Sequence, residues 1–154
     1  MMYELFKTLH IIGVILLVGN VTVSAVWKGF ADRNGQAAVV AYAQRLITIT
    51  DWSLTLSGIV LIMIGGYGAS YASGQNPFRA DWLILGQVLF GISGAIWVFI
   101  LIPLQIRLAR SARRFAAAGG IPEAYWQDSR RWLFWGIVAT IPLVGTVYVM
   151  VVRP

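Results

Sequence analysis

His10, the single histidine of the chain, lies in the apolar stretch KTLHIIGVILLVGN and is the side chain best suited to bind a metal. An ionisable residue inside a hydrophobic span costs free energy, so such residues are candidates for function. The imidazole can form a structural hydrogen bond to Gln87 or to a backbone carbonyl, titrate in a proton path, or ligate haem iron. A single histidine cannot ligate haem from both sides within one chain. Haem would therefore need an open sixth position, a ligand such as methionine, or sharing between subunits.

Depth along the expected helices separates the polar residues of the spans into two layers. At about 1.5 Å per residue, His10 and Gln87 lie at similar depths, because their helices run in the same direction. These two residues form an outer layer. Lys7 is one turn before His10 and close enough to the surface to extend its amine to the membrane interface.

The inner layer contains polar residues from the first three spans: Asn20, Ser24, Thr48, Asp51, Thr55 and Gln105. We expect Asp51 to face the polar residues of the first span, or Arg45, rather than lipid. Its helix face continues through Gly58 and Gly65, a pattern typical of close helix packing. Two interpretations of Asp51 stay open, a structural cross-link and a proton-linked or ligand-binding role.

No catalytic constellation is complete in this sequence. His10 and Asp51 are separated in depth by about 10 Å, too far for a direct acid–base pair. No serine or second histidine completes a nucleophilic triad. The sequence therefore assigns no reaction to the chain.

Four apolar runs position these side chains, approximately over residues 3–27, 47–70, 82–105 and 132–152. Each is long enough to cross a hydrocarbon core of about 30 Å as a helix. The chain is 58% hydrophobic and only 12% charged, whereas soluble domains average about a quarter charged residues. We predict an all-α, four-helix transmembrane bundle with up-down-up-down topology, formed by residues 1–154 as a single domain.

Positive charge is distributed unequally between the connecting segments. Nine of the 12 lysines and arginines lie in segments 28–46 and 106–131. The positive-inside rule therefore predicts that these are cytoplasmic loops and that both termini are outside the cytoplasm. The net charge of +6 then indicates anionic lipid rather than nucleic acid as the partner. The expected headgroup contacts are Arg107, Arg110, Arg113 and Arg114.

The segment between the third and fourth spans begins as a continuation of the third helix. Gly119 and Gly120 are expected to stop that helix. Pro122 suits the first turn of a short second helix, which we expect to lie at the membrane interface.

The chain resembles the small bacterial integral membrane proteins of domain of unknown function 2269, and this resemblance implies a location in a bacterial inner membrane. The matching tracts are LHIIGVILLVGN, DWSLTLSGIVLIMIGG, IPLQIRL, and IPEAYWQDSRRW with the closing MVVRP. It is more remotely similar to copper-resistance D type proteins and to HemJ-type protoporphyrinogen oxidase, which share a four-helix core and a histidine in the leading helix.

The HemJ type resemblance implies haem binding by His10. That type also uses a lysine early in the third helix, where this chain has Gln87. The neutral amide of Gln87 cannot replace the amine of a lysine, so the resemblance does not extend to the oxidase activity.

Three functional hypotheses follow. The first is a protein that binds haem b and takes part in membrane redox chemistry or haem metabolism, with His10 as proximal ligand and Gln87 nearby. The second is a non-enzymatic carrier of protons or a small solute, with Asp51, Asn20 and Thr48 in its polar route. The third is a structural or assembly partner without ligand. Gly58 and Gly65 suggest that the bundle could form a homodimer.

Overall fold

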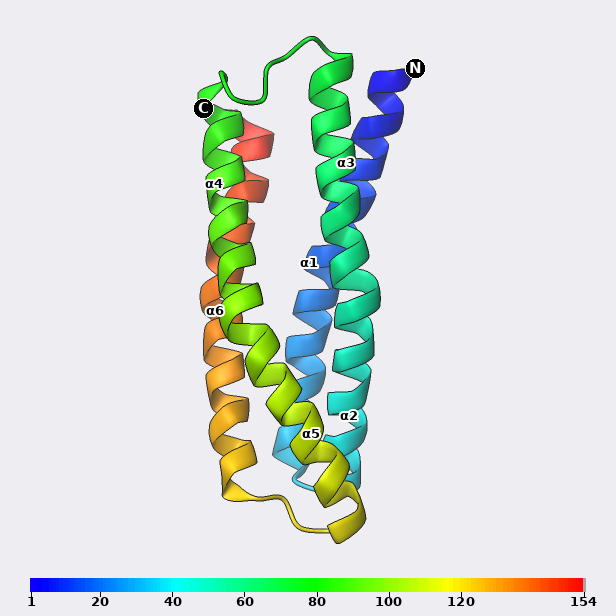
Figure 1. Ribbon diagram of the computed structural model, residues 1–154, viewed down its shortest axis with the longest axis vertical. Coiled ribbons are helices and arrows are strands. Elements are labelled where there is room, and N and C mark those ends of the chain that lie inside the picture. The colour runs from blue at the N-terminus through cyan, green and yellow to red at the C-terminus, as the bar shows by residue number, and fades with distance from the viewer. Residues whose placement is uncertain (154) are drawn as a thin grey trace.

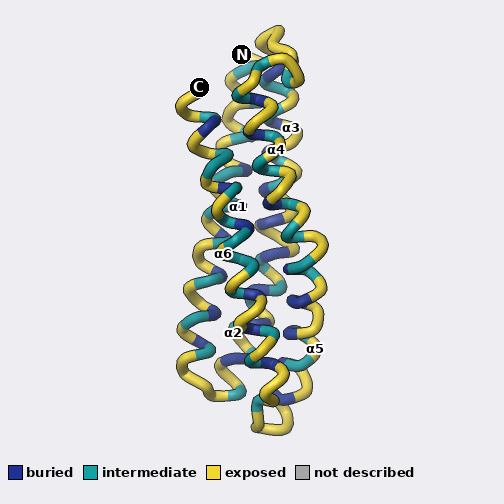
Figure 2. The backbone as a smooth tube through the Cα atoms, turned by 90° about the vertical axis from the view of Figure 1, so that its left-hand side faces the viewer, coloured by how far each residue is buried: buried dark blue, intermediate teal, exposed yellow. Residues whose placement is uncertain are grey.

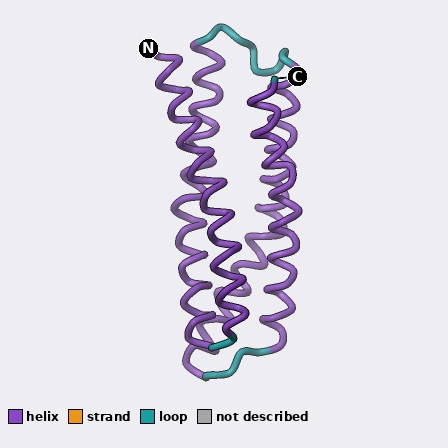
Figure 3. The backbone as a smooth tube through the Cα atoms, turned by 180° about the vertical axis from the view of Figure 1, so that it is seen from behind, coloured by secondary structure: helices purple, strands orange, loops and turns teal. Residues whose placement is uncertain are grey.

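The computed structural model describes residues 1–153 and is built from four long helical rods (Figure 1). The rods comprise α1 (Met2–Asn34), α2 (Ala37–Thr50) with η1 (Asp51–Thr55) and α3 (Leu56–Ala72), α4 (Asp81–Ile96) with η2 (Trp97–Leu101) and α5 (Ile102–Ala118), and α6 (Glu123–Val152). Successive rods run in opposite directions, and the N and C labels lie at the same end of the bundle (Figures 1 and 3). The predicted all-α, up-down-up-down bundle is confirmed.

All four rods are long and apolar enough to cross a membrane. The 33 residues of α1 extend about 50 Å, which exceeds a hydrocarbon core of about 30 Å. Large apolar side chains such as Ile137 and Ile141 are exposed. Exposed residues, drawn in yellow, dominate the outward side of the tube in Figure 2. This surface suits contact with lipid chains.

Segments 28–46 and 106–131, expected to be loops, are mostly helical. The first is interrupted only around Gly35, whose φ of 71° ends α1 in a left-handed conformation. In the second, Gly119 stops α5 as expected. Pro122 precedes a helix that is continuous with the fourth span, so the separate short helix predicted there was wrong. The helices therefore extend beyond the apolar runs at this end, which we call the basic end. The opposite end, with both termini, is the terminal end.

Glycines allow α1 and α3 to pack with their backbones in close contact. A Cβ atom on Gly13 would lie 2.8 Å from the carbonyl oxygen of Gly58, and one on Gly65 would lie 2.6 Å from that of Phe6. The close-packing face predicted for Gly58 and Gly65 thus exists. It is used within the chain, against α1, rather than between two subunits.

The bundle is closed at the basic end and open at the terminal end. At the basic end, α2, α5 and α6 share a core that includes Ile47, Leu108, Phe115 and Tyr125. Towards the terminal end, α1 pairs with α3 and α4 pairs with α6, and within residues 1–153 the backbone of α4 approaches neither α1 nor α3.

Two π-helical turns interrupt the rods near their middle. Pro103 follows η2 and has no N–H to donate to the carbonyl of Phe99, which accounts for the wide turn there. At η1, the hydroxyls of Thr50 and Ser53 donate to carbonyls of the preceding turn, a contact that bends helices. Beyond η2, α5 leans across the bundle towards α2 (Figure 1).

Candidate functional site

A cleft of about 510 Å³ separates the α1–α3 pair from the α4–α6 pair at the terminal end. Leu17, Ile62 and Leu143 pack together where the two pairs meet and close the cleft towards the basic end. The residues that line the cleft are mainly apolar, and a few of them are polar. This combination of an apolar interior and few polar groups is typical of small-molecule and cofactor sites.

His10 lies on the wall of this cleft, and its ring is held by α3. Its Nδ1 atom is 2.9 Å from the carbonyl oxygen of Ile62. Because a carbonyl can only accept, Nδ1 is the donor of this hydrogen bond, and in a neutral ring Nε2 then keeps its lone pair. Gly66 makes the position possible, since a Cβ there would lie 3.1 Å from Nδ1. A histidine whose Nδ1–H donates to a backbone carbonyl is the usual form of a metal-binding imidazole.

Gln87 lines the same cleft but does not bond to His10. Its Nε2 atom donates to the carbonyls of Pro77, at 2.9 Å, and Leu83, at 3.1 Å. Its Oε1 atom accepts from the hydroxyl of Tyr67 at 2.8 Å. Of the hydrogen-bond partners considered for His10, the structure shows the backbone carbonyl. Gln87 instead ties α4 to α3 and to the connection between them.

Two cationic side chains lie at the mouth of the cleft. Lys7 and Arg153, from opposite ends of the sequence, are both exposed and both line it. The Lys7 amine lies 5.7 Å from the ring centre of Tyr3, and the Arg153 guanidinium 5.1 Å from a ring of Trp82. The cleft thus combines an apolar interior with a positive rim.

The inner polar layer is organised around Asp51, which is buried. The Asn20 side-chain amide donates to Asp51 Oδ1 at 2.8 Å and lies 2.9 Å from the hydroxyl of Thr55. The Ser24 hydroxyl donates to the side-chain oxygen Oδ1 of Asn20 at 3.5 Å. Asp51 thus faces Asn20, as expected, whereas Arg45 is exposed and forms no ion pair within residues 1–153.

The remaining members of the inner layer, Thr48 and Gln105, line a second cavity of about 230 Å³ that reaches Asp51. The Thr48 hydroxyl donates to the carbonyl of Gln44 at 2.8 Å. This cavity lies between the η1 and η2 regions, towards the basic end. It is separate from the cleft that contains His10.

The four arginines expected at lipid headgroups occupy different environments, although all are exposed. Arg107 forms a bidentate ion pair with Asp128, at 2.9 and 3.0 Å. Arg110 and Arg113 line the second cavity, and Arg114 does not.

Residues 4–154 match the protein family described as predicted integral membrane protein (DUF2269). The chain belongs to this family. The match covers nearly the whole chain and agrees with the four membrane-spanning rods. No curated protein and no solved structure matches the chain.

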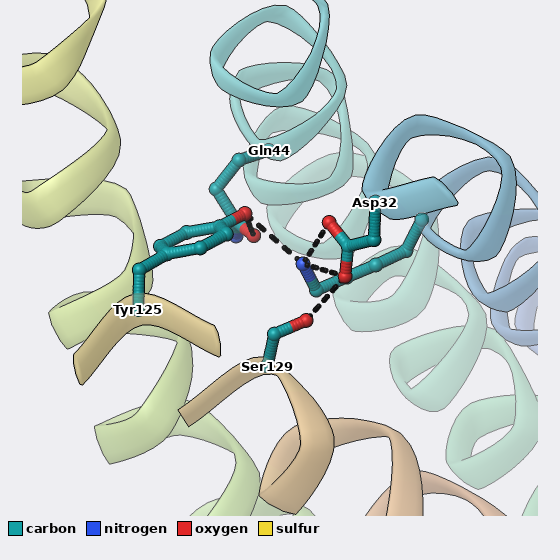
Figure 4. Close-up of polar contacts among 5 residues, drawn as sticks. Asp32, Gln44, Tyr125 and Ser129 are labelled. Atoms are coloured by element: carbon teal, nitrogen blue, oxygen red, sulfur yellow. Dashed lines mark hydrogen bonds and ion pairs between the residues drawn. The ribbon is translucent and has the colours of Figure 1, made fainter. Parts of the chain in front are cut away.

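A buried polar cluster at the basic end was missed by the sequence analysis (Figure 4). Lys28 is 1% exposed, and its amine lies 3.1 and 3.2 Å from the carboxylate oxygens of Asp32 and 3.1 Å from the hydroxyl of Tyr125. Ser129 donates to the same carboxylate, and Tyr125 donates to Gln44 Oε1 at 3.4 Å. The cluster joins α1, α2 and α6.

The sequence contained a signal for part of this cluster. Asn20, Ser24 and Lys28 recur every four residues and therefore share one helix face. Lys28 and Asp32 continue the same spacing. In the sequence, Lys28 contributes only to the positive charge of segment 28–46, because the residues of α2 and α6 that join its cluster are distant along the chain.

Proposed function

We propose that the cleft at the terminal end binds haem b, with His10 as the iron ligand, and that the protein serves membrane redox chemistry or haem metabolism. The observation that carries the proposal is the hydrogen bond from His10 Nδ1 to the Ile62 carbonyl. It fixes the ring at the wall of a large apolar cleft and leaves Nε2 free to ligate.

The lining of the cleft fits an amphipathic, anionic macrocycle. Leu83, Phe90 and Leu143 offer apolar surface for a porphyrin, and Lys7 and Arg153 offer cations for its propionates. Met63 and Met150 supply thioethers on the same lining, and a thioether is a known haem ligand.

Bound haem would supply one-electron chemistry at this site. The residues of the chain would bind it, orient it and exclude water. Gln87 has its amide engaged with Pro77, Leu83 and Tyr67, so its role would be to hold the wall of the cleft.

The proposal places the cleft on the side of the membrane away from the cytoplasm. The charge bias directs the basic end to the cytoplasm of a bacterial inner membrane. The cleft, which opens beside the two termini, would then receive its ligand from the outer half of the bilayer or from outside the cell.

The test is the absorption spectrum of protein purified from haem-replete cells. We expect a Soret band that is lost or shifted in His10→Ala and restored in part when imidazole is added. Thr8→Ala is the matched control, because Thr8 is exposed on the same helix and does not line the cleft. A wild-type protein without a Soret band, or a band unchanged in His10→Ala, would refute the proposal.

A second candidate function is a non-enzymatic carrier of protons or a small solute. It is favoured by the cavity of about 230 Å³ that leads from the basic end to Asp51, which is hydrogen-bonded to Asn20. Intramembrane carboxylates of this kind serve in proton relays.

The carrier hypothesis predicts proton flux in proteoliposomes that falls strongly in Asp51→Asn. Asp81→Asn is the control, because Asp81 is exposed at the terminal end. Equal flux in wild type and Asp51→Asn would count against it.

A further inference from the structure

The second cavity, like the cleft, has positive side chains at its mouth that form no ion pair within residues 1–153. Three ion pairs join side chains of residues 1–153, and they use Lys28, Arg107 and Arg130. Arg110 and Arg113 take part in none of them, although both line this cavity. Two guanidinium groups one turn apart on α5 therefore have donors available for an anion.

We propose that this cavity binds a phosphate group, held by Arg110 and Arg113. The guanidinium group presents paired N–H donors whose geometry matches phosphate oxygens, and its charge is weakly hydrated. The phosphate could belong to a phospholipid headgroup or to a soluble phosphate ester, because both offer the same oxygens.

The depth of the arginines agrees with this chemistry. They follow Gln105 on the same helix by about 7.5 and 12 Å along the axis, towards the basic end. Asp51 lies at the deep end of the cavity, where its Oδ1 accepts the Asn20 amide and the Thr55 hydroxyl. The anion would thus sit at the mouth, away from the carboxylate.

Both π-helical turns contribute to the walls of the cavity, the rest of which comes mainly from α5. Asp51 and Trp52 belong to η1, and Trp97 belongs to η2. Such turns are rare and occur frequently at functional sites. Trp52 is half exposed, and tryptophan is enriched at the membrane interface, where its ring meets headgroups.

The experiment measures phosphate binding by purified full-length protein in detergent. One arm titrates phosphatidylglycerol and counts bound lipid by native mass spectrometry. The other arm titrates glycerol 3-phosphate and measures heat. The test variant is Arg110→Gln/Arg113→Gln, and Arg110→Lys/Arg113→Lys keeps the charge without the paired donors. Arg114→Gln is the control, because Arg114 is exposed on the same helix and does not line the cavity.

We expect the glutamine variant to bind about tenfold or more weakly than wild type, the lysine variant to be intermediate, and the control to be unchanged. If the glutamine variant binds phosphatidylglycerol more weakly, the cavity is a headgroup site. If it binds glycerol 3-phosphate more weakly, the cavity is a site for a soluble ester. Elution volume and helical circular dichroism verify that each variant is folded. No binding in either arm, or equal binding by wild type and the folded glutamine variant, would overturn the proposal.

Discussion

At the scale of single residues, the buried acidic and basic side chains of this bundle, Asp51 and Lys28, each have side-chain partners. Asp51 accepts from Asn20, and Lys28 pairs with Asp32. Burying a charge is costly unless a partner and hydrogen bonds accompany it. Asn20 of α1 bonds to Asp51 of η1, and Tyr125 and Ser129 of α6 bond to the Lys28–Asp32 pair of α1. The contacts that satisfy these groups therefore also hold helices together.

The Lys28–Asp32 pair yields a stability prediction with a direction. In Asp32→Ala, the almost completely buried Lys28 keeps only Tyr125 as a partner. We therefore expect the free energy of unfolding to fall by about 3–5 kcal/mol. Lys28→Met should cost less, because Asp32 keeps the Ser129 hydroxyl and some access to water. Thermal unfolding in detergent, followed by circular dichroism, measures both.

The control for that prediction is the exposed pair of Arg130 and Glu123. Glu123→Ala should cost at most about 1 kcal/mol, as is usual for surface ion pairs. If Glu123→Ala lowered the free energy of unfolding as much as Asp32→Ala, the argument from burial would be contradicted.

At the scale of elements, small residues decide how closely two helices approach. In lipid, helices gain little from apolar burial alone, so backbone proximity and packing determine which pairs form. The glycines of α1 and α3 allow this proximity, whereas α4 and α6 are joined by hydrogen bonds such as Ser93 to the Ala139 carbonyl, at 2.8 Å.

Two glycines of α1 make a matched pair of tests. Gly13→Ala would place a Cβ 2.8 Å from the Gly58 carbonyl, so α1 and α3 must separate and the protein should lose stability. Nothing lies within 4 Å of a Cβ on Gly19, and alanine favours a helix by about 0.5–1 kcal/mol over glycine. The midpoint temperature of thermal unfolding should therefore be lower for Gly13→Ala than for wild type, and equal or higher for Gly19→Ala. Equal midpoints for both variants would show that the close contact contributes nothing.

At the scale of the whole molecule, the bundle presents one closed end and one open end. The closed end has the larger core and the polar cluster of Lys28, and the open end has the cleft beside His10. The positive-inside rule predicts that the closed, basic end faces the cytoplasm.

Cysteine labelling tests this orientation, because the chain has no cysteine of its own. The connection between α3 and α4 lies at the terminal end and that between α5 and α6 at the basic end (Figure 3). Gln75→Cys lies in the first connection and Gly120→Cys in the second, and both positions are exposed. In intact cells a membrane-impermeant thiol reagent should label Gln75→Cys and reach Gly120→Cys only after permeabilisation. The reverse pattern would invert the predicted topology and move the cleft to the cytoplasmic side.

The sequence by itself determined the number and approximate position of the helices, because apolar runs of spanning length are a local property of the chain. It also included Asn20 among the few expected neighbours of Asp51, since depth restricts which polar groups can meet. It did not reveal that His10 bonds to the Ile62 carbonyl, because backbone acceptors leave no mark in side-chain patterns.

Only the tertiary structure decided how the helices pair and where space remains between them. The pairing of α1 with α3 and of α4 with α6 depends on glycine contacts and on hydrogen bonds between distant residues. That pairing opens the cleft beside His10 and separates it from the cavity beside Asp51. Cavities arise from the packing of several helices at once, and so depth along individual helices could group the polar residues but could not show the spaces they line.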